Sequence, residues 1–153
     1  MKINIIQATE EYINEIHKIE TECFTDPWSK HSFLCEIENE HSFLLAAIDE
    51  SNNVLGYASL WHIINEGQIN NIAVAPWFRK NGVGNLLMEE IFARAKELNM
   101  IGLTLEVRKT NTPAIRLYDK FGFKSEGIRK NYYEFPTEDA IVMWKYMEAT
   151  HDS

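Results

Sequence analysis

The sequence predicts an α/β domain built on a mixed, mostly antiparallel sheet. The main indication is a strand–turn–helix pattern from Gln68 to Leu98, which a further strand at 101–107 completes as a β-α-β unit. Two predicted hairpins supply the antiparallel part, and their strands lie at 42–48 with 54–64 and at 123–135 with 139–147. The chain has 153 residues, of which 45% are hydrophobic and 25% charged. These values are typical of one globular domain with its own core, which we place at 1–153.

The N-terminal part is predicted to contain one strand and two helices. Isoleucines that alternate with polar residues indicate a strand at 2–7. A helix is expected after Thr9, which can cap it, and Pro27 ends it because the residue before a proline avoids helical geometry. Ser29 can cap a second, shorter helix. The positions on the inner faces of these helices are Ile13, Ile16, His17 and Ile19 in the first, and Phe33, Leu34 and Ile37 in the second.

Turn residues and periodicity define the remaining elements. A turn at 49–53 separates the strands of the first hairpin. A long helix is predicted from about 82 to 98, because apolar residues recur there at spacings of mainly three and four. A shorter helix begins at Asn111 and ends at Gly122. Alternation in the strand at 101–107 places Leu103, Leu105 and Val107 on one face and Thr104, Glu106 and Arg108 on the other.

Composition and charge narrow the possible functions. The net charge of −8 argues against general nucleic-acid binding and is compatible with a cationic substrate such as an amine or a basic peptide. No apolar run reaches the roughly 18 residues of a membrane span, and the N-terminus shows no signal peptide. Cys23 and Cys35 form no Cys-x-x-Cys pair and are expected to be reduced and buried in a cytoplasmic protein. The histidines are scattered, so no metal site is expected; they are His17, His31, His41, His62 and His151.

The turn before the long helix can bind an anion. Its residues are Arg79, Lys80, Asn81, Gly82, Val83, Gly84 and Asn85. A helix N-terminus carries unpaired N–H groups and a partial positive charge, and glycines let the backbone approach a phosphate closely. The pattern is not a P-loop, because no lysine follows Gly84, and it is not a dinucleotide fingerprint, because Leu87 occupies the position of the third glycine. Two glycines before a surface helix are also compatible with an ordinary loop, so residues elsewhere in the chain are needed to distinguish an anion site from such a loop.

Two side chains could handle protons. Glu106, on the polar face of its strand, could act as a general base toward an ammonium group. An α-ammonium group, with a pKa of about 7.7–8.0, loses its proton more readily than a lysine side chain at about 10.4. Tyr118, in the following helix, could donate a proton to a leaving thiolate. Each also has an ordinary interpretation, as a surface charge and as a core tyrosine, and Asn111 could be a helix cap or could bind a cofactor amide.

The combination of motifs resembles one subfamily of the GCN5-related N-acetyltransferase (GNAT) superfamily. The turn at 79–84 fits the R/Q-x-x-G-x-G/A loop that binds the pyrophosphate of acetyl-CoA in that superfamily. Further runs are similar to those of RimI-type ribosomal-protein-alanine N-acetyltransferases: Pro27-Trp28-Ser29, Leu105-Glu106-Val107-Arg108, Asn131-Tyr132-Tyr133 and Glu138-Asp139-Ala140. The similarity covers nearly the whole chain.

The resemblance implies an enzyme that transfers acetyl from acetyl-CoA to the N-terminal alanine of the eighteenth small-subunit ribosomal protein, by direct attack of the amine on the thioester. It also implies that the strands at 68–75 and 101–107 splay apart to admit the pantetheine arm. Glu106 would be the base and Tyr118 the acid. The implied cofactor-binding groups are the backbone of Ile72, Ala73 and Val74, the turn residues 79–85 and Asn111. The implied lining of the acceptor groove is Trp28, Tyr132, Tyr133 and Asp139.

Two other functions stay open. One is acetylation of a small amine such as a polyamine, which the acidic charge suits, whereas the run Tyr132-Tyr133 favours a peptide. The other is a non-catalytic module that senses acyl-CoA. The segment between Tyr133 and Glu138 is shorter than the resemblance implies, and it borders the acceptor site. We expect a monomer whose partner is a basic protein or peptide N-terminus, without nucleic acid or membrane.

Overall fold

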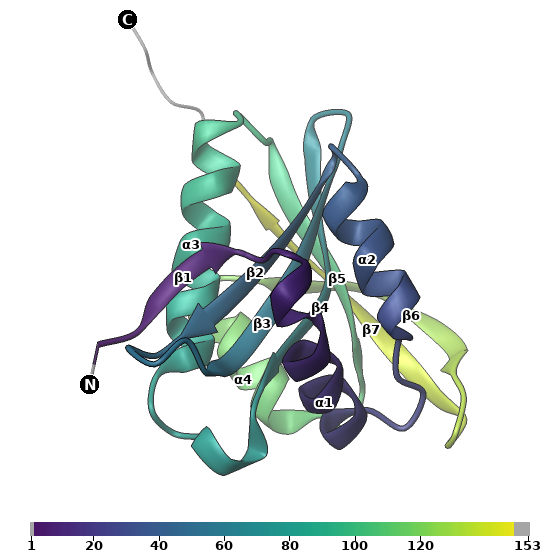
Figure 1. The fold of residues 1–153 in the computed structure, drawn as a ribbon. Coiled ribbons are helices and arrows are strands. Elements are labelled where there is room, and N and C mark those ends of the chain that lie inside the picture. The colour runs from purple at the N-terminus through teal and green to yellow at the C-terminus, as the bar shows by residue number, and fades with distance from the viewer. Residues whose placement is uncertain (1, 149–153) are drawn as a thin grey trace, which may run out of the picture.

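A computed structural model describes residues 2–148, and one seven-stranded sheet runs through the fold (Figure 1). The strands are β1 (Asn4–Gln7), β2 (Ser42–Ile48), β3 (Val54–Ile63), β4 (Glu66–Val74), β5 (Gly102–Arg108), β6 (Lys124–Tyr133) and β7 (Glu138–Tyr146). The helices are α1 (Ile13–Cys23), α2 (Lys30–Glu38), α3 (Val83–Glu97) and α4 (Thr112–Lys120), with 3₁₀ turns at Glu10–Tyr12 and Pro76–Phe78. The strand order is β1-β2-β3-β4-β5-β7-β6, with β4 and β5 parallel and the other neighbours antiparallel. The predicted mixed, mostly antiparallel sheet is therefore confirmed.

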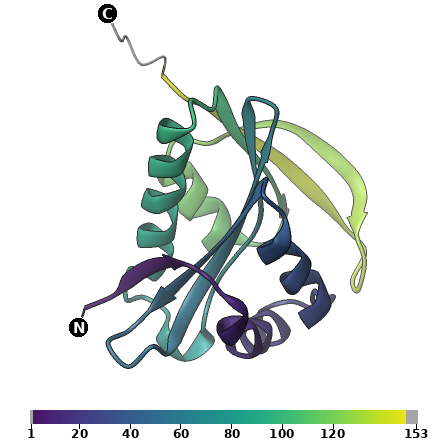
Figure 2. The ribbon, with the colours of Figure 1, turned by 45° about the horizontal axis from the view of Figure 1, so that its top comes forward.

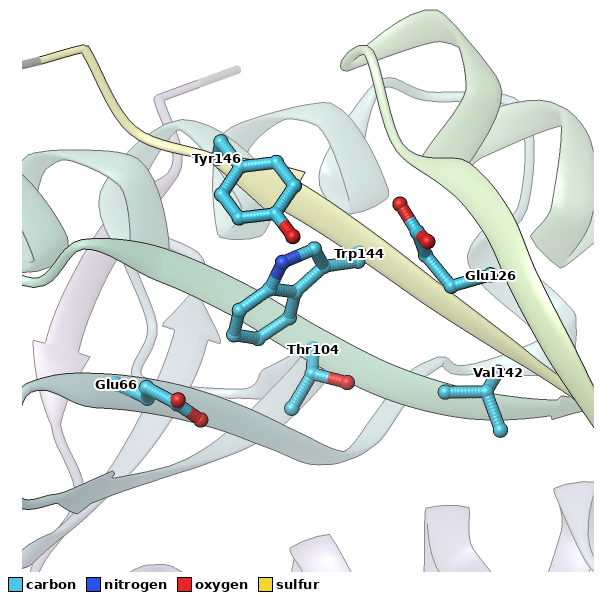
Figure 3. A pocket seen from close by; sticks show the side chains of 6 residues that line it. All are labelled: Glu66, Thr104, Glu126, Val142, Trp144 and Tyr146. Carbon is cyan, nitrogen blue, oxygen red and sulfur yellow. The ribbon is translucent and has the colours of Figure 1, made fainter.

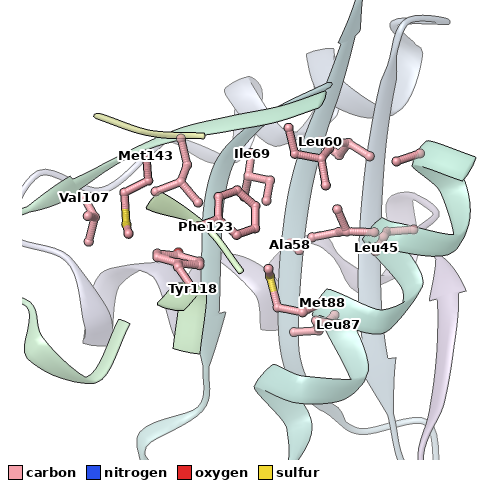
Figure 4. Close-up of a cluster of buried hydrophobic side chains, with 14 of the residues drawn as sticks. Leu45, Ala58, Leu60, Ile69, Leu87, Met88, Val107, Tyr118, Phe123 and Met143 are labelled. Atoms are coloured by element: carbon pink, nitrogen blue, oxygen red, sulfur yellow. The ribbon is translucent and has the colours of Figure 1, made fainter. Parts of the chain in front are cut away.

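Helices cover the two faces of the sheet unequally (Figures 1 and 2). On one face, α3 and α4 enclose a core cluster with the inner side chains of the strands (Figure 4). On the other face, α1 and α2 pack mainly on β2, β3 and β4 around a second cluster. Leu103, Leu105 and Val107 belong to the α3–α4 cluster, so alternation directs Glu106 to the α1–α2 face, as predicted. That face of β5, β7 and β6 lies beyond the helices, and β6 is exposed along nearly its whole length.

The parallel strands β4 and β5 separate part-way along their length. They are paired from Glu66 opposite Gly102 to Ile69 opposite Leu105. Beyond this point β4 continues to Val74 and β5 to Arg108 without pairing to each other. A wedge therefore opens between the two strands, and it leaves backbone hydrogen-bonding groups of β4 free for another partner. This is the splay that the resemblance implied.

A β-bulge places two consecutive asparagines of β4 on the same face of the sheet. Ser59 pairs with Asn71 and Leu60 with Ile69, so Asn70 is the extra residue. Asn71 bonds to Glu20 of α1, whereas Ile69 and Ile72 on either side of the pair pack in the α3–α4 cluster. The bulge lies where the wedge opens. It re-aims the polar side chains of β4 toward the α1–α2 face at this point.

Two local predictions are wrong. Thr9 does not cap α1, because a 3₁₀ turn intervenes and the Thr9 hydroxyl bonds to Glu11 Oε1 at 3.1 Å. Both cysteines are free, as expected, but Cys35 is exposed and Cys23 is only half-buried, because Cys35 lies on the outer face of α2. The Ser29 cap of α2 is confirmed, since its hydroxyl accepts from Ser32 N at 3.1 Å. No helix within residues 2–148 is long and apolar enough to cross a membrane, and His151 lies outside the described residues.

Candidate active site

The N-terminus of α3 is shaped to hold an anion. Gly82 precedes the helix with a φ of +81°, Lys80 has a φ of +66°, and the first turn contains no acidic residue. The first N–H groups of the helix have no intrahelical partner. The Asn81 amide donates to the carbonyls of Phe78 and Arg79, both at 3.1 Å, and this fixes the loop. These groups fit a phosphate or pyrophosphate by charge and by backbone geometry.

The basic side chains near the N-terminus of α3 do not all lie at the candidate anion site. Lys120 of α4 donates to Asn85 Oδ1 at 3.0 Å, so its ammonium group lies over the first turn of α3. Arg79 instead directs its guanidinium group toward α1, where it lies 3.6 Å from Cys23 Sγ. Lys80 is exposed at the turn itself. Two lysines therefore supply the local positive charge, and Lys120 is one that the sequence did not indicate.

The free edge of β4 faces the wedge. Ala75 N donates to the Leu55 carbonyl of β3, so by alternation Ala73 also directs its backbone groups to β3. Ile72 and Val74 then direct theirs to the wedge. The Cys23 thiol lies 3.6 Å from the Val74 carbonyl. Of the three predicted backbone positions, Ile72 and Val74 are available to an extended ligand arm, whereas Ala73 is engaged in the sheet.

Glu106 lies where β5 leaves β4, and neighbouring side chains hold both of its oxygens. Arg129 Nε of β6 is 3.4 Å from Oε1, and the Tyr132 hydroxyl donates to Oε2 at 3.3 Å. The Glu106 side chain is 17% exposed and Arg129 58% exposed. The carboxylate is thus fixed in position and reachable from the α1–α2 face, as a general base requires.

The aromatic pair of the β6–β7 hairpin stands beside this carboxylate. Tyr132 and Tyr133 contact each other edge to face, with ring centroids 5.1 Å apart. Arg108 lies 4.5 Å from the Tyr133 ring centroid and donates to the Glu134 and Pro136 carbonyls at 2.8 and 2.9 Å. The end of β5 therefore anchors the short hairpin, and both tyrosines are held at the mouth of the wedge.

Tyr118 is on the opposite side of the sheet from Glu106. It is 5% exposed and packs against Phe123 within the α3–α4 cluster, with ring centroids 5.9 Å apart (Figure 4). Burial raises the pKa of Tyr118 well above its ordinary value, and the nearby Tyr133 raises it further. The phenol is therefore fully protonated at neutral pH and can act as a donor.

Three predicted site residues have structural partners. The Asp139 carboxylate accepts from Asn131 N at 2.9 Å inside the β6–β7 hairpin. Asn111 caps α4 by accepting from Ala114 N at 3.3 Å. Trp28 packs on Phe33, with ring centroids 5.4 Å apart, and is half-buried. Their contacts with acceptor or cofactor stay predictions.

A buried carboxylate beneath the site was missed. Glu20 of α1 is 1% exposed and accepts hydrogen bonds from Trp28 N at 2.8 Å, Asn71 Nδ2 at 3.0 Å and the Tyr57 hydroxyl. It joins α1, the α1–α2 loop, β3 and β4. The sequence carried a signal for this role, because Ile13, Ile16 and Glu20 share one face of the helix. An acid on an apolar face has to find buried donors.

Known proteins share this arrangement of sequence and fold. Residues 13–123 match the model of the acetyltransferase (GNAT) family. A Bacillus subtilis protein, to which ribosomal protein bS18-alanine N-acetyltransferase activity is assigned provisionally, is 41% identical over 135 residues, which are 88% of this chain and 89% of that protein. The ribosomal protein bS18-alanine N-acetyltransferase of Haemophilus influenzae is 35% identical over 135 residues, which are 86% of this chain and 90% of that protein.

The fold agrees with the sequence. The crystal structure of the ribosomal-protein-S18-alanine N-acetyltransferase from Escherichia coli matches with a TM-score of 0.88, at 27% identity and over 98% of both chains. The structure of Ard1 from Thermoplasma volcanium also matches with a TM-score of 0.88, at 27% identity and over 96% of this chain and 99% of that one. With a family match over most of the sequence and relatives aligned along nearly their full length, this chain belongs to the acetyltransferase (GNAT) family.

Proposed function

We propose that this chain transfers an acetyl group from acetyl-CoA to the α-amino group of an N-terminal alanine, and that its acceptor is ribosomal protein bS18. The names of the Bacillus and Haemophilus relatives support the acceptor. The observation that carries the chemistry is the placement of Glu106 where β4 and β5 part, between an anion site on one face of the sheet and an open surface on the other.

The donor side of the site is formed by backbone groups. The turn from Lys80 to Asn85 and the N-terminus of α3 would hold the pyrophosphate of acetyl-CoA, with Lys120 adding positive charge. Ile72 and Val74 would bond to the pantetheine arm in the wedge. When bound, acetyl-CoA supplies an activated acetyl group, so the chemistry needs positioning and proton handling from the protein.

Glu106 and Tyr118 would handle the protons. Glu106 accepts a proton from the acceptor ammonium group, directly or through a water, and the free amine then attacks the thioester carbon. The carbon–sulfur bond breaks as the carbon–nitrogen bond forms, and the sulfur leaves with the bonding electrons. Tyr118 would donate its proton to that sulfur, and the nitrogen, which loses its second proton as the amide forms, would return one to the phenol. Because its pKa is raised, the phenol stays protonated until the sulfur carries the charge.

The acceptor is expected to meet the aromatic pair first. Tyr132 and Tyr133 stand beside Glu106 and would contact the first residues of the peptide, with Trp28 and Asp139 at the edges of the groove. We further infer that a single domain, 1–153, acts as a monomer in the cytoplasm on a protein N-terminus, without binding nucleic acid or membrane. Gel filtration of the protein with and without peptide tests the oligomeric part of this proposal.

The test measures release of free CoA thiol with three acceptors. These are a peptide that begins with Ala, the same peptide with a blocked N-terminus and a free lysine, and spermidine. Turnover with the free N-terminus alone is expected. Turnover with spermidine alone would assign the protein to small-amine acetylation, and binding of acetyl-CoA without any turnover would favour a sensor.

Two variants test the assigned roles. Glu106→Gln should lower kcat by about 10²–10⁴ and Tyr118→Phe by about 10², with the KM for acetyl-CoA unchanged. Glu97→Gln, which removes a carboxylate from the far end of α3, is the matched control and should retain full turnover. If Glu106→Gln keeps more than a third of the wild-type kcat, Glu106 is not the base.

A further inference from the structure

A shallow cavity of about 370 Å³ lies on the part of the α1–α2 face that the helices leave uncovered (Figure 3). Four strands contribute to it. Its lining residues are Glu66 of β4, Thr104 of β5, Glu126 of β6, and Val142, Trp144 and Tyr146 of β7. In Figure 3 the Trp144 indole occupies the middle, with Glu66 on one side and Glu126 on the other.

The lining has the chemistry of a cation site. Trp144 and Tyr146 contact edge to face, with ring centroids 5.3 Å apart, and both rings line the cavity. Neither Glu66 nor Glu126 forms an ion pair with any residue from 2 to 148. Lys124 lies opposite Trp144 in the sheet register, but it does not line the cavity. Carboxylates flanking an indole attract an ammonium or guanidinium group through charge and through the ring face.

The cavity lies next to Glu106 on the same face of the sheet. Val142, which lines the cavity, is the direct cross-strand partner of Glu106. Thr104 lies two residues before Glu106 on the same face of β5, and Glu66 is level with Gly102, four residues before it. At about 3.3 Å per residue, the far end of the cavity is roughly 13 Å from Glu106 along the sheet. An extended acceptor covers that distance in about four residues.

We propose that this cavity binds a lysine or arginine side chain of the acceptor protein, located about four residues after the acetylated N-terminus. The inference rests on the proposed function, because it takes Glu106 as the position of the acceptor amine. Charge complementarity supports this occupant, since the chain carries a net charge of −8 and neither cavity carboxylate has an ion-pair partner among residues 2–148. The site would distinguish basic N-terminal segments from neutral ones that also begin with alanine.

The test uses peptides that begin with Ala and are otherwise neutral, with one lysine moved from position 2 to position 8. The wild type should show its lowest KM with the lysine at positions 4 to 6. In Glu66→Gln/Glu126→Gln this preference should fall by about three- to tenfold, as exposed ion pairs allow, and the KM for the neutral peptide should not change. Trp144→Leu should weaken the preference by about threefold. In both variants, kcat and the KM for acetyl-CoA should match the wild type.

Controls separate local from general effects. Glu97→Gln, combined with Glu22→Gln, removes the same net charge from exposed positions elsewhere and should leave the preference intact. The preference should shrink as salt rises from about 0.05 to 0.5 M, because screening weakens exposed charge pairs. A preference for lysine at position 2 alone, or an equal KM rise for neutral and basic peptides, would overturn the proposal.

A binding experiment tests this inference independently of the proposed function. A fluorescent peptide that is already N-acetylated, with a lysine at position 5, can be titrated by anisotropy without turnover. Loss of its binding in Glu66→Gln/Glu126→Gln would support the cavity even if the wild type acetylated no alanine peptide. Equal binding by the wild type and this variant would overturn the cavity even if alanine peptides were acetylated well.

Discussion

The carboxylate of Glu20 offers the sharpest test of how the site is supported. Replacing Glu20 by Ala removes the only acceptor that the described residues provide to three donors: the Tyr57 hydroxyl, the Asn71 amide and Trp28 N. Tyr57 is fully buried, and Asn71 lies in β4 next to the wedge. The substitution therefore leaves stranded donors on three different segments.

The expected loss can be worked out from this network. A stranded buried donor costs about 1–3 kcal/mol, so three donors, of which the Trp28 amide is partly accessible, cost about 3–6 kcal/mol. A domain of this size is stable by about 5–15 kcal/mol and loses about 2–4 °C of Tm per kcal/mol. Glu20→Ala should therefore lower Tm by roughly 10–20 °C. Glu22→Ala, on the exposed side of the same helix, is the control and should change Tm little.

Thermal denaturation followed by circular dichroism measures the effect, and a second substitution makes the test specific. Tyr57→Phe removes one of the stranded donors, so the double variant Glu20→Ala/Tyr57→Phe should be more stable than Glu20→Ala by about 1–3 kcal/mol. The reasoning fails if Glu20→Ala melts within about 3 °C of Glu22→Ala, or if Tyr57→Phe destabilises both backgrounds equally.

Three further results are expected. Gly56→Ala should lower the free energy of unfolding by about 1–3 kcal/mol and raise the KM for acetyl-CoA. The reason is that a Cβ at Gly56 would lie 2.8 Å from the Ala73 carbonyl and 2.9 Å from Val83 at the start of α3. Gly127→Ala, which has open space around it, is the control in the same thermal melts. Lys80→Ala and Lys120→Ala should each raise the KM for acetyl-CoA about three- to tenfold in initial-rate assays. Arg79→Ala should raise this KM by a smaller factor, because the Arg79 guanidinium group faces Cys23. A larger effect of Arg79→Ala would contradict this placement. Burial raises the pKa of Glu20 above 4.5, so the stabilisation linked to its protonation is complete below that pH and is lost as pH rises through the folded-state pKa. The Tm difference between the wild type and Glu20→Gln should therefore shrink over that pH range. A difference that grows with pH would refute the direction of the shift.

Local patterns were enough to predict the order of helices and strands. The spacing of apolar residues in α3 and the alternation in β5 depend only on near neighbours in the chain, and both were read correctly. The helix cap predicted at Thr9 was wrong, because a threonine before acidic residues fits a 3₁₀ turn as well as an α-helix, and only packing decides between the two. The wedge between β4 and β5 was expected from the resemblance alone, because no local signal marks where two strands stop pairing.

Partners of polar side chains could not be predicted, because they come from distant parts of the chain. Asp139 bonds inside its own hairpin, and Lys120 reaches Asn85 from another helix. The bulge at Asn70 likewise depends on how β3 and β4 align. The face on which Glu106 lies could be predicted, because alternation along a strand is a local property.

The proposed roles of Glu106 and Tyr118 restrict where the reaction would occur. Glu106 is reached from the α1–α2 face, and Tyr118 is enclosed on the α3–α4 face. A pair of reactants in contact with both side chains would therefore lie within the sheet, where β4 and β5 part. The anion site at α3 opens to the α3–α4 face and the acidic cavity to the other, so donor and acceptor would enter from opposite sides. This arrangement fits the proposed direct attack of the amine on the thioester, because both substrates would be present at the wedge at the same time.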